Sequence, residues 1–500
     1  MDRDLYRVEA EEFSAQLGRE SYRHFAGLAD RSAIDSLYAR HTSLFDRRAV
    51  DSWREAAAGE PSGRSTRELL RFCVEGHLAT LTQGIDSELA RRESRLRIPA
   101  GGDEVGLRES LTVQANEPDA QRRAQIERLR LEAQDSQLNP LRREALDAVH
   151  QRSRELGWAD HRALCEDLMG IDLAALARQS AALAEATDLH YPAIAEPELR
   201  RTLGVGFDGL ARSDLPRFFR NAGADIHFPA AALLPALDET MHHLGLDLDA
   251  GGRIHLDIES RAGKSSRAFC AAARVPEEVY LVVARSGGRE DFVSLLHECG
   301  HAQHLAGIDP SLRFEARRLG DAALGEAYAF LFDRLVDDPA WLRRRLGVRD
   351  EGRLAGHARA QRLMYLRRYG AKLQYELELH SRPPERSLDD LADVYAERLS
   401  AAMGVSWPRE TWLSDVDPGL YVANYLRAWV LEAGLRQSLR ERFGSLWFEQ
   451  AAAGAFLREL WHEGRVRDAD ELLADLFGAR LDLGLLLADL ALAGEPIGSS

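Results

Sequence analysis

The segment DFVSLLHECGHAQHLAG, residues 291–307, contains two histidines four residues apart, His297 and His301, with Glu298 directly after the first. Its apolar residues recur at helical spacing, so we expect a helix here. Side chains four residues apart lie on one face of a helix, where two imidazoles can bind the same metal ion. A carboxylate beside the first histidine can act as general base toward a water on that ion. The spacing therefore predicts a catalytic metal centre, with zinc as the ion.

The third ligand must come from another position, because a catalytic zinc usually has three protein ligands and one open site. His304 lies two turns from His297, about 10 Å along the helix axis, which is too far for both to bind one ion. The segment GDAALGEAYAFLFDRLV offers Glu326 in an otherwise apolar helix, 25 residues (326 − 301) after His301. A lone carboxylate in such a helix is costly unless it is paired or metal-bound. We therefore expect Glu326 to be the third ligand, with a buried salt bridge as the alternative.

The elements that hold these residues are predicted to be mainly helical. Ala, Leu, Arg and Glu dominate the chain, and apolar residues return every three or four positions. Strand patterns occur in RIHLDIES, residues 253–260, and in the β-branched run of residues 279–283, just before the HECGH helix. We expect a small β-sheet beside that helix. The run at residues 279–283 could bind an extended peptide by β-addition.

Two further segments, RRAQIERLRLEAQ and PLRREALDAVHQRSREL, combine helical periodicity with many Arg and Glu residues. Charges of alternating sign are typical of helix faces in water that carry ion pairs between successive turns. We interpret both segments as solvated helix faces rather than binding patches.

The totals for the chain restrict the class of protein. The 500 residues carry 65 basic and 81 acidic side chains, a net charge of −16, which argues against a general nucleic-acid binder. The first residues, MDRDLYRVEAEEF, resemble no secretory signal, and no stretch is apolar enough to span a membrane. The four cysteines are scattered, which favours free thiols in a reducing cytoplasm. We expect a cytoplasmic protein with no nucleic-acid or membrane partner.

A domain boundary is predicted where two prolines interrupt the helical pattern of LHYPAIAEPELRR. We expect residues 1–195 to form an N-terminal helical region and residues 196–500 to form the catalytic region with the metal motif.

Three segments together resemble the thimet oligopeptidase and oligoendopeptidase F family of zinc peptidases. They are HECGH followed by GEAYAF, the upstream RAGKSSRAFC, and the downstream DPGLYVANYLRAW, in matching order over about residues 253–429. The resemblance implies two helical lobes around a deep substrate channel, one Zn²⁺ ion, and hydrolysis of internal bonds of short peptides. It implies His297, His301 and Glu326 as zinc ligands and Glu298 as the general base.

The downstream segment carries a further implication. By position in the family, Tyr421 and Tyr425 polarise or bind the scissile carbonyl. The chain departs from the family at three sites: Val416 stands where a His is frequent, Ala428 where a Tyr is frequent, and Arg267 where a Gly is usual. These departures keep two alternatives open. One is a peptidase-like metalloenzyme with a narrow amide or biosynthetic substrate, and the other is a helical scaffold that holds zinc without turnover.

Overall fold

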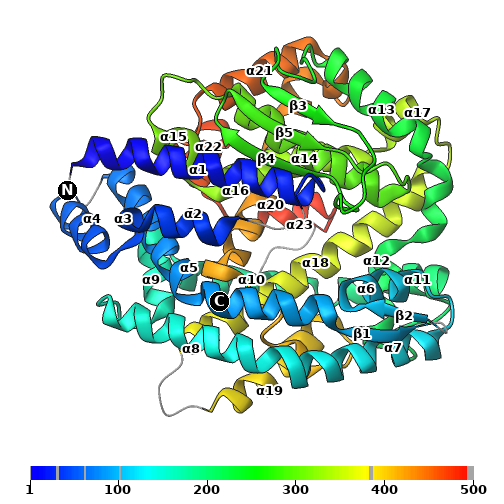
Figure 1. Ribbon diagram of the computed structural model, residues 1–500. Coiled ribbons are helices and arrows are strands. Elements are labelled where there is room, and N and C mark those ends of the chain that lie inside the picture. Colours follow the sequence, from blue (N-terminus) through cyan, green and yellow to red (C-terminus); the bar gives the residue numbers. More distant parts are fainter. Residues whose placement is uncertain (1, 30–32, 61–62, 101–102, 382–386, 493–500) are drawn as a thin grey trace, which may run out of the picture. The chain divides into compact units, whose positions relative to one another are not determined.

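The computed structural model describes residues 2–29, 33–60, 63–100, 103–381 and 387–492. Within them the chain is mainly helical with two small sheets, so the predicted mainly helical class is confirmed (Figure 1). The two lobes around a deep substrate channel stay a prediction. The strands are β1 (Arg97–Ala100), β2 (Asp103–Gly106), β3 (Ile254–Asp257), β4 (Phe269–Arg274) and β5 (Glu278–Val282). The α-helices are α1 (Arg3–Phe25), α2 (Ile34–Arg40), α3 (Thr42–Phe45), α4 (Arg47–Gly59), α5 (Arg64–Arg95), α6 (Leu107–Asn116), α7 (Ala120–Ala133), α8 (Asn139–Glu155), α9 (His161–Met169), α10 (Leu173–Thr187), α11 (His190–Leu203), α12 (Leu215–Arg220), α13 (Ala230–His243), α14 (Arg289–Gly307), α15 (Phe314–Arg318), α16 (Ala322–Asp333), α17 (Pro339–Leu346), α18 (Glu351–His380), α19 (Leu388–Met403), α20 (Val422–Phe443), α21 (Ala451–His462), α22 (Ala469–Phe477) and α23 (Leu485–Asp489).

Two compact units make up the chain, and each is discontinuous in sequence. Unit 1 comprises Met1–His77, Ala224–Ala355 and Arg427–Leu481, and unit 2 comprises Leu78–Gly223, Gly356–Leu426 and Asp482–Ser500. The predicted boundary after residue 195 falls inside α11, and unit 1 takes segments from both sides of it. The division into an N-terminal helical region and a catalytic region stays a prediction about function, distinct from these structural units.

A three-stranded sheet in unit 1 has the strand order β3-β5-β4 and lies beside α14, as predicted (Figure 1). β5 runs parallel to β3 and antiparallel to β4, with Val279 opposite Ile254 and Leu281 opposite Cys270. Because β5 is paired on both sides, the prediction that residues 279–283 accept a peptide by β-addition is wrong. β4 escaped prediction because its sequence, FCAAAR, is rich in alanine, which has little strand preference.

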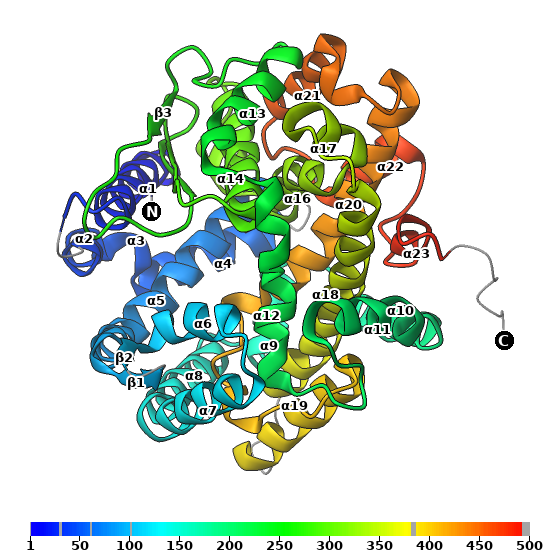
Figure 2. The same cartoon turned by 90° about the vertical axis from the view of Figure 1, so that its right-hand side faces the viewer.

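Unit 2 contains the β1–β2 hairpin, packed against α6 and α7 around a core of apolar side chains (Figure 2). That core is formed by Ile98, Ala100, Leu107, Ile126 and Leu138. α7 contains most of RRAQIERLRLEAQ, one of the segments interpreted as a solvated face.

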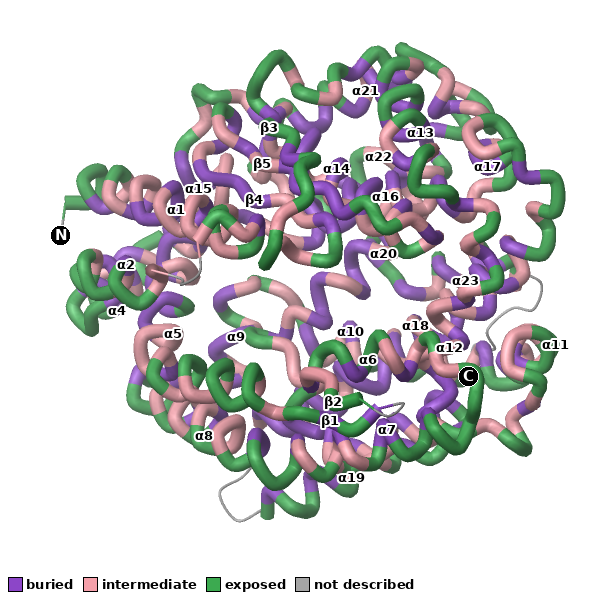
Figure 3. The backbone as a smooth tube through the Cα atoms, turned by 45° about the vertical axis from the view of Figure 1, so that its right-hand side comes forward, coloured by how far each residue is buried: buried purple, intermediate pink, exposed green. Residues whose placement is uncertain are grey.

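The interpretation of α7 as a solvated face is wrong for three of its charged residues, Arg123, Glu127 and Arg130, which are buried. Figure 3 shows buried as well as exposed stretches of the tube around α7. Arg123 forms a buried ion pair with Asp214 at 2.6 Å. The pair of Arg128 and Glu132, also at 2.6 Å, is exposed as expected. The alternating signs predicted ion pairs correctly, but they could not distinguish pairs in water from pairs between packed elements.

Two further sequence expectations have structural counterparts. The four cysteines, Cys73, Cys165, Cys270 and Cys299, all lie among the described residues and form no disulfide. Among the described helices, none combines the length and the apolar character needed to cross a lipid bilayer.

Candidate metal centre

Two carboxylates bind backbone N–H groups at the start of α14, the helix that carries HECGH. Asp225 accepts the backbone N–H of Arg289 through Oδ1 at 3.0 Å, and Asp291 accepts the N–H of Gly287 at 2.7 Å. Carboxylates at a helix N-terminus satisfy N–H groups that lack partners inside the helix. From this start α14 buries Phe292, Leu295, Leu296, Cys299 and Ala302, and the two histidines face its less buried side. Cys299 packs behind the histidines, as the helical spacing predicts.

α14 and α16 approach each other closely at Gly300, the fourth residue of HECGH. A Cβ atom at this position would lie 2.7 Å from Cα of Ala329 and 2.8 Å from the backbone oxygen of Tyr328. Side chains do not tolerate such distances from backbone atoms, so only glycine allows this packing. The close approach is what brings α16, and Glu326 with it, to the histidines.

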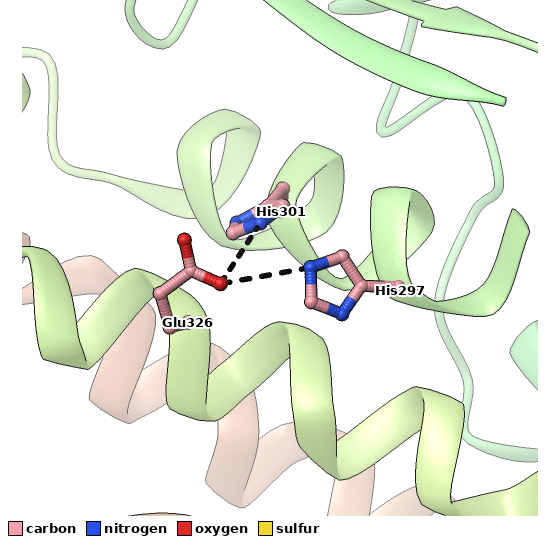
Figure 4. A group of neighbouring side chains, drawn as sticks. All are labelled: His297, His301 and Glu326. Atoms are coloured by element: carbon pink, nitrogen blue, oxygen red, sulfur yellow. Dashed lines mark ion pairs between the residues drawn. The ribbon is translucent and has the colours of Figure 1, made fainter. Parts of the chain in front are cut away.

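His297, His301 and Glu326 converge on one point (Figure 4). Oε2 of Glu326 lies 3.6 Å from Nε2 of His297 and 3.8 Å from Nε2 of His301, and the candidate ligand atoms all lie within 4.8 Å of one another. The two imidazole planes are nearly perpendicular, at 86°. The three residues predicted as ligands are therefore brought together by two helices of unit 1.

This donor set suits a zinc ion. Tetrahedral zinc binds nitrogen and oxygen at about 2.0–2.2 Å, which places neighbouring ligand atoms about 3.3–3.5 Å apart. The two separations from Glu326, 3.6 and 3.8 Å, need only a few tenths of an ångström of contraction. The group as a whole lies within 4.8 Å, so the two histidines would also have to move closer together around the ion. Two imidazoles and one carboxylate form a set that leaves a fourth position open. A buried salt bridge, the alternative explanation for Glu326, would not require two histidines to face the same carboxylate oxygen.

Asp333, which the sequence analysis missed, holds His297 in place. Its Oδ2 lies 2.9 Å from Nδ1 of His297. A proton on Nδ1 leaves the lone pair of Nε2 directed at Glu326, the arrangement that a metal-binding histidine needs. Burial alone would lower the pKa of His297, but the hydrogen bond and charge of Asp333 raise it to about 9, so binding of a metal ion would displace the proton from Nε2. Asp333 stands seven residues after Glu326, which places both on the same face of α16, so the sequence spacing indicates a second carboxylate near the histidines.

Glu298 is held by the edge strand β4. The backbone N–H of Cys270 donates to its Oε2 at 2.8 Å. Burial raises the pKa of Glu298 to about 7, although the charge of His297 and the Cys270 N–H oppose the shift. A carboxyl group with a pKa near neutrality can take up and release a proton readily, which is what a general base must do. His304 lies outside the ligand group and is fully buried.

An ion pair fixes the beginning of α16. Asp321 caps the helix by accepting the N–H of Ala323 at 3.0 Å, and Arg427 binds both of its oxygens at 2.9 and 2.7 Å. Burial would raise the pKa of Asp321, but Arg427 and the N–H groups lower it to about 2. Glu326 follows five residues later, so this pair positions the helix that carries the third ligand.

The two predicted tyrosines belong to unit 2. Tyr421 and Tyr425 are half-buried and make an edge contact with each other, with ring centroids 5.0 Å apart, and Tyr425 also contacts Tyr369. Their role toward the metal group in unit 1 stays a prediction. Ala428, one of the three departures named in the sequence comparison, is fully buried in α20 and serves packing.

The remaining candidates near the strands have structural roles or lie in water. Lys264 pairs with Asp257 at 3.1 Å and also donates to two backbone oxygens, so its charge serves the loop. Arg267 is exposed.

Comparison with known proteins adds a structural likeness without a sequence match. No protein-family model matches the chain, and no curated protein matches it by sequence. A crystal structure from Bacillus anthracis strain Ames, of a protein provisionally named oligoendopeptidase F, is similar, with a TM-score of 0.63 at 12% sequence identity. The match covers 98% of this chain and 85% of that one. The chain therefore has the fold of that structure over nearly its whole length.

Proposed function

We propose that this protein is a zinc-dependent metallopeptidase that hydrolyses internal bonds of short peptides. The observation that carries the proposal is the convergence of His297, His301 and Glu326, with Glu298 fixed beside them. The likeness to the Bacillus anthracis structure supports it, because that protein carries the name oligoendopeptidase F.

Different residues of the chain have different roles in such a reaction. A zinc ion held by His297, His301 and Glu326 would supply a Lewis acid that acidifies water and polarises a carbonyl. Glu298 accepts a proton from the attacking water and passes it to the leaving amine. The Cys270 N–H holds one carboxylate oxygen of Glu298, which leaves the other oxygen to handle the proton.

The proposal includes a role for the tyrosines of unit 2. A hydroxyl group of Tyr421 or Tyr425 would donate a hydrogen bond to the oxyanion that forms on the substrate. Removal of one such donor typically lowers the rate about 100- to 1,000-fold. Phe replacements at each position should lower kcat with zinc content unchanged. Wild-type kcat in both variants would remove the tyrosines from the mechanism.

The decisive test compares the wild type with Glu298→Gln. Purified proteins are assayed for zinc content and incubated with a mixed library of short peptides, with and without a chelator. We expect internal cuts by the wild type that the chelator abolishes, and normal zinc content without cuts in Glu298→Gln. Cleavage by the variant would contradict the assigned base. Zinc without cleavage by the wild type would favour the narrow-substrate enzyme or the non-catalytic scaffold.

A further inference from the structure

A second candidate site lies wholly within unit 2, in a cavity of about 320 Å³. Its walls come from α5, α6, α7, α8, α18 and α19, from the segment that follows α19, and from the residues Gln134 and Arg212. The size is at the lower end of the range for small-molecule sites. Arginine is the most frequent residue in its lining, with Arg108, Arg130, Arg142, Arg212 and Arg368.

The positive charge of this cavity exceeds the negative charge around it. Glu93 pairs with Arg108 at 2.9 Å, Asp415 pairs with Arg368, and Glu127 pairs with Arg212 at 2.8 Å. Five arginines thus meet three carboxylates, which leaves two guanidinium groups, those of Arg130 and Arg142, in excess.

Arg130 is the more buried of these two groups, with 7% of its side chain exposed. Its Nη2 donates to Gln114 at 3.1 Å and lies 3.5 Å from Glu127, which Arg212 already binds more closely. Its Nε has no hydrogen-bond partner among the described residues. Burial, and then the charge of Arg212, lower the pKa of Arg130 to about 10. A buried donor without a partner is costly, so the guanidinium group of Arg130 is incompletely compensated, and an anion in the cavity would offset its charge.

Arg142 also has no ion pair with a carboxylate among the described residues. Its one hydrogen bond among the described residues is to the amide oxygen of Asn139, at 3.2 Å. Burial lowers the pKa of Arg142, because the charged form loses hydration without full compensation by an ion pair.

Two of the other arginines are rigidly placed. The guanidinium groups of Arg212 and Arg368 lie over the ring of Trp407, at 5.0 and 5.8 Å from its centroid. Asp415, the partner of Arg368, also accepts a hydrogen bond from Tyr395 at 2.8 Å. Groups that are held before a ligand arrives lose little conformational freedom on binding.

We propose that this cavity binds a small oxyanion, a ligand that presents a phosphate or a carboxylate group to Arg130 and Arg142. Guanidinium groups recognise both kinds of group through charge-assisted, often paired, hydrogen bonds. The site is separate from the metal centre in sequence and in structural unit, and it stands whether or not the protein is a peptidase.

The test titrates the full-length protein with inorganic phosphate and, separately, with succinate, by calorimetry at constant ionic strength. We expect saturable binding of at least one of them, and competition between the two identifies the preferred group. Arg142→Gln should weaken binding about tenfold or more, because a hydrogen bond between charged groups is lost. Arg154→Gln is the matched control, an exposed arginine on the same helix that is absent from the cavity lining, and it should bind like the wild type.

A second variant keeps the test valid if Arg142→Gln folds poorly. Leu111 lines the cavity and is 43% exposed, so Leu111→Glu should fold normally and place a competing carboxylate at the mouth. It too should weaken binding. Absence of saturable binding of both probes to the wild type would overturn the proposal, as would equal affinities in wild type, Arg142→Gln and Leu111→Glu.

Discussion

Replacement of Gly300 by alanine tests whether the close approach of α14 and α16 creates the metal site. Gly300 is the only residue of HECGH without a side chain, and it faces the backbone of α16 at Tyr328 and Ala329. The variant Gly300→Ala adds one methyl group at this contact and leaves all three ligands unchanged. Any loss of metal affinity would therefore come from the distance between the helices.

The size of the effect follows from the distances. The added Cβ would lie 2.7 Å from Cα of Ala329, where an ordinary contact begins at 3.4 Å, so the helices must separate by about 0.7 Å (3.4 − 2.7). If this shift reaches Glu326, its distances to the two histidines grow from 3.6 and 3.8 Å to about 4.3 and 4.5 Å. Zinc needs about 3.3–3.5 Å between ligand atoms. Changes in the groups that merely orient ligands cost about 10- to 100-fold in affinity, so displacement of a ligand should cost at least about 100-fold.

Two measurements check this expectation. Zinc affinity is measured by competition with a chelating indicator, and stability by denaturant unfolding of the metal-free protein. Overpacking should lower the free energy of unfolding by about 1–3 kcal/mol, offset in part by the better helix propensity of alanine.

The matched control is Gly84→Ala in α5, where an added Cβ meets nothing within 4 Å. It should raise stability by about 0.5–1 kcal/mol and leave zinc affinity unchanged. Wild-type zinc affinity in Gly300→Ala would refute the link between this contact and the site.

Three further predictions concern the groups around the ligands. Asp333→Asn should lower zinc affinity about 10- to 100-fold in the same competition assay, because His297 loses the carboxylate that orients it. An unchanged affinity would show that Asp333 does not contribute to metal binding. Arg427→Gln should lower the free energy of unfolding by about 3 kcal/mol or more at pH 6, since it leaves a buried carboxylate with fewer partners. Because the folded pKa of Asp321 lies below its ordinary value of 3.8, the stabilisation by Arg427 is present above pH 4 and is lost as the pH falls toward 2; unfolding curves should therefore show a smaller difference between wild type and Arg427→Gln at pH 3 than at pH 6.

The grouping of the candidate metal ligands could be predicted because each of these residues depends on local sequence. His297 and His301 share a face through helical periodicity alone, and Glu326 stands out as a carboxylate in an apolar helix. The strands β3 and β5 were likewise visible from their alternating or β-branched residues. In each case the preference for a helix, for a strand or for a paired carboxylate depends on residues that are close in sequence.

Features that depend on contacts between distant segments could not be predicted. The pairing of β5 on both sides requires β4, whose alanines give no strand signal. The burial of Arg130 depends on elements that fold over α7, so charge alternation alone could not reveal it. The same limit applies to Tyr421, which directly precedes α20, and to Tyr425 within α20. Their spacing places them about one helical turn apart, but it gives no distance to a candidate metal ligand.

The carboxylates of α16 illustrate one rule, that an acidic side chain in an apolar helix requires a partner. The cost of a lone carboxylate in an apolar helix identified Glu326, and the same cost applies to Asp333 at the end of AALGEAYAFLFD. Seven residues are nearly two helical turns, so both carboxylates face α14. One contacts both histidines through Oε2, and the other fixes the Nδ1 side of His297. Asp321, at the start of the same helix, faces Arg427 instead. Along a buried helix, each acid therefore requires a partner, and its phase on the helix indicates which neighbouring segment supplies it.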